Sequence, residues 1–239
     1  MVLAKVLCLP RSPPGALDPP PSFVASLLGP GDGAPFGSRY CGHVPGVQQD
    51  KAVLRQQLLA ARSGLPADQR RDAGRLIRDT LLDLPALQMA GTVAAYYSVG
   101  TEPDTRGLVY ALWKRGTYVL LPLLRPDGDL DWASYEGPDS LVPGPRGLAE
   151  PGESPRGTGA VARADVVLAP ALAVDQAGNR LGRGGGSYDR ALARVGPLIP
   201  VIALLYDAEL LGRVPAEPHD TPVRAAVRPG SGITWLSAG

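Results

Sequence analysis

The sequence predicts an α/β protein in which helices cover both faces of a mostly parallel sheet. Short continuous apolar runs, which are typical of strands buried on both faces, alternate along the chain with segments whose apolar residues recur at helical spacing. Such alternation is typical of parallel sheets, because parallel strands need helical crossovers. With 239 residues, of which 44% are hydrophobic, the chain can bury the core of one domain, predicted at residues 49–239.

Residues 1–48 differ from the rest of the chain. They are rich in Pro and Gly and show neither a strand period nor a helix period. A segment with so few periodic apolar residues cannot bury enough surface to offset the entropy of ordering it, so we predict that it is disordered. It is either a tail of the mature protein or a translated stretch upstream of the true start.

Two helices are expected before the first strand. The first begins at Asp50, a plausible N-cap, and ends at Gly64. The second has Pro66 in its first turn and stops at Leu84-Pro85. The apolar residues assigned to the two buried faces are Val53, Leu54, Leu58 and Ala61, and Ala73, Leu76, Ile77 and Leu81.

Strands and helices then alternate. The first strand is expected at residues 92–97, and Asp104 can cap the helix that follows and ends at Gly116. A continuous apolar strand at 118–123 is joined by an Asp127-Gly128 turn to a shorter strand at 130–135.

A long Pro/Gly-rich loop at 138–159 separates these strands from a buried strand at 166–169, and loops of this length are more often functional than idle. The remaining predicted elements are a helix around 188–194, a strand at 200–205, a short helix capped by Asp207 and a last strand at 225–227.

Charge and cysteine content limit the function classes. The 24 basic and 23 acidic side chains leave a net charge of +1, and no apolar run approaches the ~18 residues of a membrane span. We therefore expect small-molecule substrates, with no nucleic acid and no membrane as partner. The two cysteines, Cys8 and Cys41, and the lack of a convincing secretion signal favour the cytoplasm.

A glycine-rich loop is the strongest local signal. Gly182, Gly184, Gly185 and Gly186 allow backbone N–H groups to approach phosphate oxygens, and the start of the next helix adds partial positive charge. Arg180, Arg183 and Arg190 supply cations. The alternative is a flexible surface turn, but the arginines and the following Tyr188-Asp189 pair favour a site. The loop matches neither a P-loop nor a dinucleotide fingerprint, so it does not identify the phosphate chemistry.

Polar clusters follow the predicted strands at residues 98–105, at Glu150-Pro151 and at 179–189. Ligands of open α/β sheets bind at the carboxyl ends of strands. We therefore expect these clusters to meet in one cleft.

These motifs resemble the 5-formyltetrahydrofolate cyclo-ligase family, also called methenyltetrahydrofolate synthetases. The resemblance covers roughly residues 49–227. It rests on a K-x-x-L-R start at 51–55, Glu102 within 97–105, GLAEP at 147–151, NRLGRGGGSYDR at 179–190, and His219-Asp220.

The resemblance implies a monomeric enzyme that uses ATP with Mg²⁺ to close the ring of 5-formyltetrahydrofolate. It implies that Arg180, Arg183 and Tyr188 are catalytic and that Asp189 and Asp220 hold Mg²⁺. The folate substrate would contact Tyr97, Glu102, Arg183, Gly184, Gly185 and Gly186. The residues implied for ATP are Lys51, Arg55, Arg180, Leu181, Gly182, Arg183, Gly184, Gly185, Gly186, Ser187 and Tyr188.

Each assignment has a simpler alternative. Lys51 and Arg55 share one helix face, which is otherwise an exposed face, and Arg180 or Arg183 is otherwise a solvated arginine. Asp189 could cap a helix and Asp220 could close a turn. Trp132 and Tyr135 could contact folate or belong to the core.

Ser187 stands where many family members have an aromatic residue, which puts the contact made by that residue in doubt. Two other functions stay open: a non-catalytic relative that binds nucleotide or folate, and another small ATP-using phosphotransferase.

Overall fold

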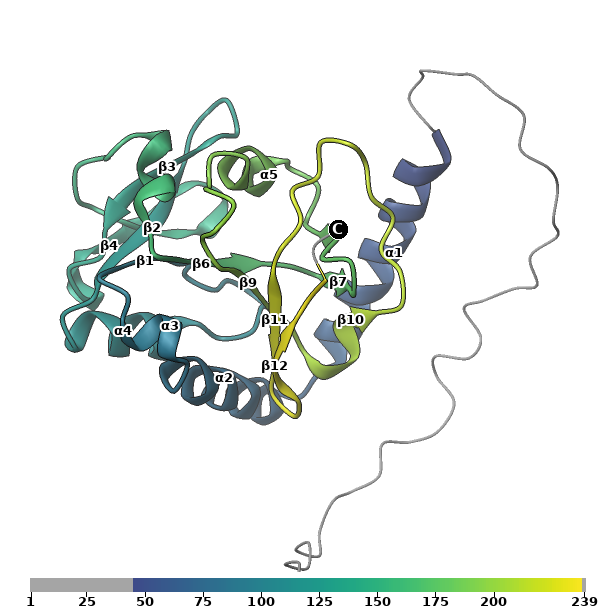
Figure 1. Cartoon of the computed structure of the whole chain (residues 1–239), viewed down its shortest axis with the longest axis horizontal. Coiled ribbons are helices and arrows are strands. Elements are labelled where there is room, and N and C mark those ends of the chain that lie inside the picture. The colour runs from purple at the N-terminus through teal and green to yellow at the C-terminus, as the bar shows by residue number, and fades with distance from the viewer. Residues whose placement is uncertain (1–44, 238–239) are drawn as a thin grey trace, which may run out of the picture. The chain divides into compact units, whose positions relative to one another are not determined.

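The structure is a computed structural model and describes residues 45–237 of the chain (Figure 1). Its centre is a seven-stranded sheet with the order β12-β11-β9-β6-β1-β2-β3. The strands from β11 to β2 run parallel, and the two edge strands β12 and β3 run antiparallel to their neighbours. The strands of this sheet, in chain order, are β1 (Thr92–Ala94), β2 (Tyr118–Leu124), β3 (Leu130–Ser134), β6 (Val166–Pro170), β9 (Val201–Leu204), β11 (Ala225–Arg228) and β12 (Gly232–Trp235).

Alternate residues of the central strands enter two separate apolar clusters. In β6, Val166 and Leu168 belong to one cluster, whereas Val167 and Ala169 belong to the other. A strand that is apolar on both faces must be covered on both, because its side chains alternate in direction. This explains the continuous apolar runs in the sequence.

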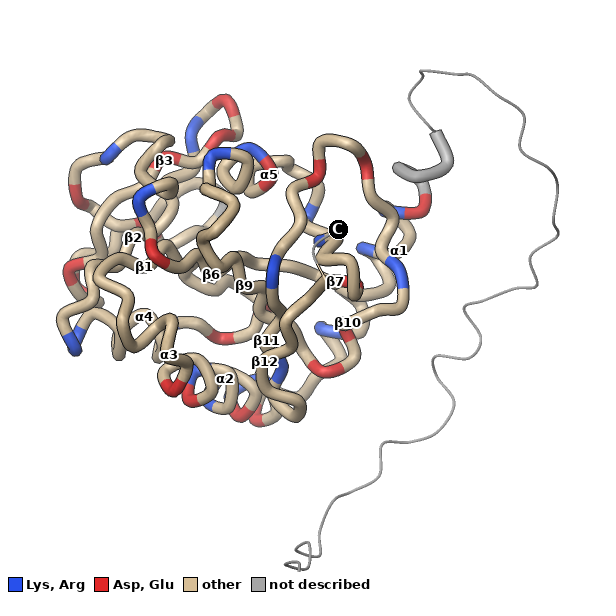
Figure 2. Tube along the Cα trace, viewed as in Figure 1, with Lys and Arg blue, Asp and Glu red and all other residues tan. Residues whose placement is uncertain are grey.

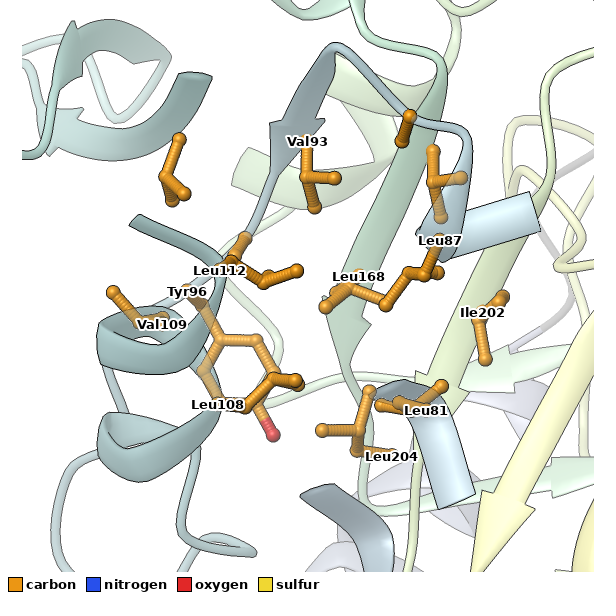
Figure 3. Packing of buried hydrophobic residues seen from close by; sticks show 14 of the residues in the cluster. Leu81, Leu87, Val93, Tyr96, Leu108, Val109, Leu112, Leu168, Ile202 and Leu204 are labelled. Carbon is orange, nitrogen blue, oxygen red and sulfur yellow. The ribbon is translucent and has the colours of Figure 1, made fainter. Parts of the chain in front are cut away.

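Helices cover both faces, as predicted. The first cluster, shown in Figure 3, packs the sheet against α2 (Ala67–Leu82), α3 (Pro85–Gln88) and α4 (Arg106–Lys114). The second packs the opposite face against the 3-10 helix η3 (Thr158–Arg163) and α5 (Ser187–Leu192). In Figure 1 α2 and α5 lie on opposite sides of the sheet.

Helix α1 (Pro45–Gly64) packs on a small second sheet with the order β10-β7-β8, formed by Leu210–Leu211, Ala173–Asp175 and Arg180–Leu181. The sheet buries Leu172, Leu181 and Val214, and Leu54, Leu58 and Leu59 of the helix pack against them. Asp175 supports the turn from β7 to β8, because its carboxylate accepts hydrogen bonds from the N–H groups of Ala177, Asn179 and Val214. Strand β8 leads directly into the glycine loop.

Helix boundaries differ from the predictions where apolar periodicity is weak. Helix α1 begins at Pro45, inside the range predicted to be disordered, so Asp50 is not its N-cap. A proline is well tolerated in the first turn, but no apolar period marks the turn before residue 50. Residues 1–44, with both cysteines, lie outside the described residues.

Three predicted core positions are wrong. Val53 and Leu76 are about half exposed, at 51% and 50%, and Ala61 is exposed as well. The buried face of α2 includes Gly74 instead, where the absent Cβ leaves room for Asp104. A Cβ at residue 74 would lie 2.8 Å from Cβ of Asp104, so this close approach of α2 to Asp104 requires glycine.

Several short elements were not predicted. The loop at 138–159 contains a hairpin of β4 (Leu141–Pro143) and β5 (Ala149–Pro151) with the 3-10 helices η1 (Pro138–Ser140) and η2 (Pro145–Gly147). Strands β7, β8, β10 and β12 were also missed. Strand β1 ends three residues earlier than predicted, and Tyr206 rather than Asp207 precedes the short helix η4 (Asp207–Glu209). Thr105, not Asp104, directly precedes α4, although Asp104 Oδ1 accepts a hydrogen bond from the N–H of Arg106.

Basic and acidic residues are interspersed along the described chain (Figure 2). Among residues 45–237, no helix is long and apolar enough to cross a membrane.

Candidate functional site

A pocket of about 350 Å³ lies at the carboxyl ends of β1, β2 and β6. Its walls come from the segments that follow β1 and β6, from the end of β2, from the start of β5 and from the glycine loop. The three polar clusters expected to share one cleft all line it: Val99 and Glu102 from the first, Glu150 from the second, and most of residues 180–189 from the third. An apolar wall is made by Pro122, Leu124, Leu130, Leu148 and Ala149.

A second hollow, of about 410 Å³, lies between α2 and α4. Its lining is largely charged, and two of its arginines, Arg75 and Arg78, already pair with Asp72 and Asp79. Of the polar clusters predicted to form the site, it contains only Asp104, and the glycine loop does not line it. We therefore place the functional site in the first pocket, despite its smaller volume.

The glycine loop occupies residues 182–186, between β8 and α5. Gly184 and Gly186 have φ values of +98° and +67°, which residues with a Cβ rarely adopt. A Cβ at residue 184 would lie 3.3 Å from Cζ of Arg55, and one at residue 186 would lie 3.0 Å from Nη1 of Arg190. Two guanidinium groups thus pack directly against the loop, which requires glycine for its conformation and for this close approach.

Arg55 reaches the loop from α1, since its Nε donates a 2.9 Å hydrogen bond to the carbonyl of Gly182. Arg180 lies beneath the loop and is buried. Its Nη2 contacts Asp189 Oδ1 at 2.5 Å, its Nη1 contacts the carbonyl of Pro170 at 3.3 Å, and its guanidinium lies over the Tyr188 ring. Neither arginine is a solvated surface residue.

Glu102 forms an ion pair with Arg183 of the glycine loop. Glu102 is largely buried, its Oε2 accepts a hydrogen bond from the N–H of Val99, and its Oε1 lies 3.3 Å from Nε of Arg183. Arg183 is half exposed, so this pair leaves its guanidinium accessible from the pocket. Burial raises the pKa of the Tyr188 hydroxyl, and the charge of Glu102 adds to the rise, so Tyr188 stays neutral.

Lys51, which belongs to α1, and Asp220 form a second cluster of polar side chains. Nζ of Lys51 lies 2.6 Å from Asp220 Oδ2 and 2.8 Å from Glu217 Oε2. Burial by itself lowers the pKa of Lys51, but its hydrogen bonds to Asp220 and Glu217 together raise it, so the ammonium stays charged. Among the described residues, Glu217, His219 and Asp220 are the one set of three metal-ligand types whose ligand atoms lie within 4.8 Å of one another.

Asp189 and Asp220 come from distant segments that touch, because Thr221 Oγ1 lies 3.3 Å from the carbonyl of Asp189. Each carboxylate already accepts a hydrogen bond from a cation, Arg180 or Lys51.

Not every predicted residue faces the pocket. Tyr97, Ser187, Tyr188 and Asp189 line it, whereas Leu181 is buried against α1, and Lys51, Arg55 and Asp220 lie beside the loop rather than in the pocket wall. Neither Trp132 nor Tyr135 is among the pocket-lining residues. Trp132 is buried in the core, and the ring of Tyr135 lies 6.4 Å from that of Tyr97.

Sequence reasoning missed Tyr96 and Arg62, which also line the pocket. Strand periodicity would place Tyr96 and Tyr97 on opposite faces, but β1 ends at Ala94 and both residues line the pocket. Glu150 was noted without a role. Its Oε1 accepts a hydrogen bond from the N–H of Leu124, which holds β5 against β2.

The fold and the site define an α/β protein whose pocket, at the strand ends, joins an arginine-flanked glycine loop to a buried carboxylate. The sequence model of the 5-formyltetrahydrofolate cyclo-ligase family matches residues 47–229, so the chain belongs to this family.

Relatives of this chain with known names support the same family. The 5-formyltetrahydrofolate cyclo-ligase of Mycolicibacterium smegmatis is 40% identical, over 79% of this chain and 98% of its own. That of Escherichia coli K12 is 33% identical, over 73% of this chain and 97% of its own. The solved structure of Aquifex aeolicus 5,10-methenyltetrahydrofolate synthetase matches with a TM-score of 0.69 at 28% identity, covering 79% of this chain and 94% of that chain.

Proposed function

We propose that the protein is a 5-formyltetrahydrofolate cyclo-ligase, which uses ATP to convert 5-formyltetrahydrofolate into 5,10-methenyltetrahydrofolate, ADP and phosphate. The observation that supports this most directly is that the glycine loop and Glu102 line one pocket, since the reaction must bring a nucleotide and a folate together. Family membership over residues 47–229 supports the same activity.

The chemistry explains why both ligands must meet. A formamide oxygen is a poor leaving group, so the γ-phosphoryl group of ATP is first transferred to it. The neighbouring amine nitrogen of the folate then attacks the formyl carbon, and the C–O bond breaks to release phosphate. Such a reaction depends mainly on positioning and on neutralising the charge of the transferred group.

We assign the nucleotide to the glycine loop. The N–H groups of residues 182–186 and the guanidinium groups of Arg55 and Arg183 would bind its phosphates. Arg180 would support the loop from below while offsetting developing charge. Family resemblance also assigns Lys51 to the nucleotide, and in the structure its buried ammonium pairs with Asp220 and Glu217. Tyr188 would act as a neutral hydrogen-bond donor, because its raised pKa excludes a role as a base near neutral pH.

We assign the folate to the opposite wall. The Glu102 carboxylate would accept hydrogen bonds from the amino and ring N–H groups of the pterin, and Tyr97 would contact its ring face. The apolar wall from Pro122 to Ala149 fits the non-polar middle of the substrate.

Asp189 and Asp220 fit Mg²⁺, which prefers oxygen ligands and keeps several waters. When bound with ATP, the ion would neutralise phosphate charge. The ion pairs of the two carboxylates with Arg180 and Lys51 hold both side chains in place before nucleotide arrives.

We also propose that the protein acts as a monomer in the cytoplasm. The small number of cysteines supports this location.

A spectroscopic assay tests the activity. Purified full-length protein is mixed with ATP, Mg²⁺ and 5-formyltetrahydrofolate, and the near-ultraviolet absorbance of the methenyl product is followed together with ADP and phosphate. We expect the three products in equal amounts, and none when ATP is left out. ATP binding without any product would favour a non-catalytic binding protein instead. Phosphoryl transfer to another acceptor would favour a different phosphotransferase.

A further inference from the structure

One polar group of the pocket has no role in the reaction as described so far. Tyr96 follows β1 by two residues and is only 4% exposed. Its ring belongs to the apolar cluster of Figure 3, next to Leu108. Its hydroxyl nevertheless has no hydrogen-bond partner among the described residues, although the side chain lines the pocket.

Burying this hydroxyl costs free energy unless another group forms a hydrogen bond with it. A buried hydroxyl without a partner loses its hydrogen bonds to water and gains nothing in return. A phenylalanine would fill the same space in the apolar cluster without that cost. Because Tyr96 lines the pocket, a bound ligand can supply the missing partner.

The surroundings of Tyr96 indicate which kind of ligand group would bind its hydroxyl. The charged and titratable side chains acting on it are Glu102, Arg62, Tyr188 and Tyr206. Burial raises the pKa of Tyr96 well above its ordinary value, and the charge of Glu102 adds to the rise, so the hydroxyl keeps its proton. The Glu102 carboxylate can only accept hydrogen bonds, whereas a pterin edge also carries acceptors, its carbonyl oxygen and ring nitrogens.

We propose that the Tyr96 hydroxyl is a substrate-binding group that donates a hydrogen bond to an acceptor on the pterin edge of the folate, complementing Glu102. This inference rests on the proposed function and adds a specificity-determining contact to it. Of the two kinds of group on that edge, Glu102 binds the donors and Tyr96 binds an acceptor.

Tyr96→Phe is the test, with two matched variants. Tyr110→Phe removes a hydroxyl from an exposed residue of α4. Tyr206→Phe removes a hydroxyl that does have a partner, the carbonyl of Thr101 at 3.2 Å. For each protein, KM is measured for 5-formyltetrahydrofolate and for ATP, and the melting temperature is measured without ligands.

We expect Tyr96→Phe to raise KM for the folate about tenfold, which corresponds to the loss of one hydrogen bond. KM for ATP should be unchanged, and the melting temperature should be the same as in wild type or slightly higher. Tyr110→Phe should match wild type, and Tyr206→Phe should melt at a lower temperature. An unchanged KM for the folate overturns the proposal. So does a lower melting temperature of Tyr96→Phe with both KM values altered, because the hydroxyl would then be structural.

Direct binding of 5-formyltetrahydrofolate, measured by calorimetry, separates this inference from the proposed function. If wild type forms no methenyl product, the proposed function fails, but weaker folate binding by Tyr96→Phe would still support the hydrogen bond. Equal binding by the two proteins, or binding by neither, would refute it.

Discussion

At the scale of single residues, the glycine loop owes its shape to backbone angles and to close contacts. Gly184 combines a positive φ with a guanidinium group at van der Waals distance, whereas Gly182 has ordinary backbone angles and lies against Nη1 of Arg180. Asp189 likewise combines two roles, because its carboxylate holds Arg180 and is proposed to bind a cation. Substitutions at these positions separate effects on the site from effects on stability.

Gly184→Val should weaken ATP binding by more than about tenfold, because the side chain strains the backbone and displaces Arg55. Gly116→Val is the matched control, since Gly116 also has a positive φ, +90°, but has no atom near its missing Cβ. Both variants should lose about 1–3 kcal/mol of stability from strain, and only Gly184→Val should lose affinity in a titration with nucleotide. Equal ATP affinities would show that the loop does not touch the nucleotide.

Asp189→Asn should lower kcat by at least about tenfold and raise the Mg²⁺ concentration needed for half-maximal rate. The amide is a poorer ligand for a hard cation, but it still accepts a hydrogen bond from Arg180. Progress curves over a Mg²⁺ series measure both effects, with the exposed Asp139→Asn as control. A variant whose Mg²⁺ dependence matches wild type would remove Asp189 from the set of metal ligands.

At the scale of elements, helix α1 links the glycine loop to the C-terminal part of the chain through charged side chains. Lys51, Arg55 and Arg62 point inward, toward Asp220, Gly182 and Glu209 respectively. The Arg62 guanidinium also donates to the carbonyl of Ala171 and lies over the Tyr206 ring, whose hydroxyl contacts the segment that carries Glu102. The helix is therefore held by polar contacts as well as by its leucines.

Arg62→Met should destabilise the protein by about 3–5 kcal/mol at pH 7, because it leaves the Glu209 carboxylate buried without its partner. Arg62→Met/Glu209→Leu should recover most of this loss, since no buried charge remains. Urea unfolding followed by circular dichroism measures all three proteins. A double variant as unstable as the single one would mean that the packing of Arg62 matters more than its charge.

The loss of stability in Arg62→Met should depend on pH. Burial raises the pKa of Glu209 in the folded protein, although Arg62 opposes the rise, so removing Arg62 raises it further. A carboxyl group with a raised pKa favours folding below its unfolded pKa of about 4.3, and this contribution is lost as the pH rises through the folded value. The difference in unfolding free energy between wild type and Arg62→Met should therefore become smaller as the pH is lowered from 7 to 5.

At the scale of the whole molecule, the pocket joins segments far apart in the chain. It includes Arg62 from α1, Glu102 after β1, Glu150 from β5 and the loop before α5. A ligand that bridges these segments should stabilise the complete fold, since unfolding separates them.

ATP with Mg²⁺ at about 100 times its dissociation constant should stabilise the folded state by about 2.7 kcal/mol. For a chain of this size that corresponds to a rise of roughly 5–10 °C in melting temperature. Differential scanning fluorimetry measures the shift, and AMP, which lacks the outer phosphates, is the control. The same shift with AMP would indicate that the loop does not bind the phosphate chain.

The regular part of the fold could be predicted because its signals are local. Apolar runs such as residues 118–123 and 166–169 form strands of the central sheet, and residues 119–121 and 166–169 are buried. The strands β7, β8 and β10 could not be predicted, because two or three residues carry no period and these strands exist only by pairing with one another. Likewise, nothing local distinguishes Leu76, which is exposed, from its buried neighbour Ile77.

The sequence by itself determined the α/β class, the family and the glycine loop with its arginines, because each depends on residues that are neighbours in the chain. Only the tertiary structure decided that Lys51 lies against Asp220, 169 positions away, and that Arg62 pairs with Glu209 across 147 positions. It also decided that Tyr96 lines the pocket while its hydroxyl is buried without a hydrogen-bond partner among residues 45–237. Such contacts follow from the path of the whole chain through space, which the period of a short segment does not contain.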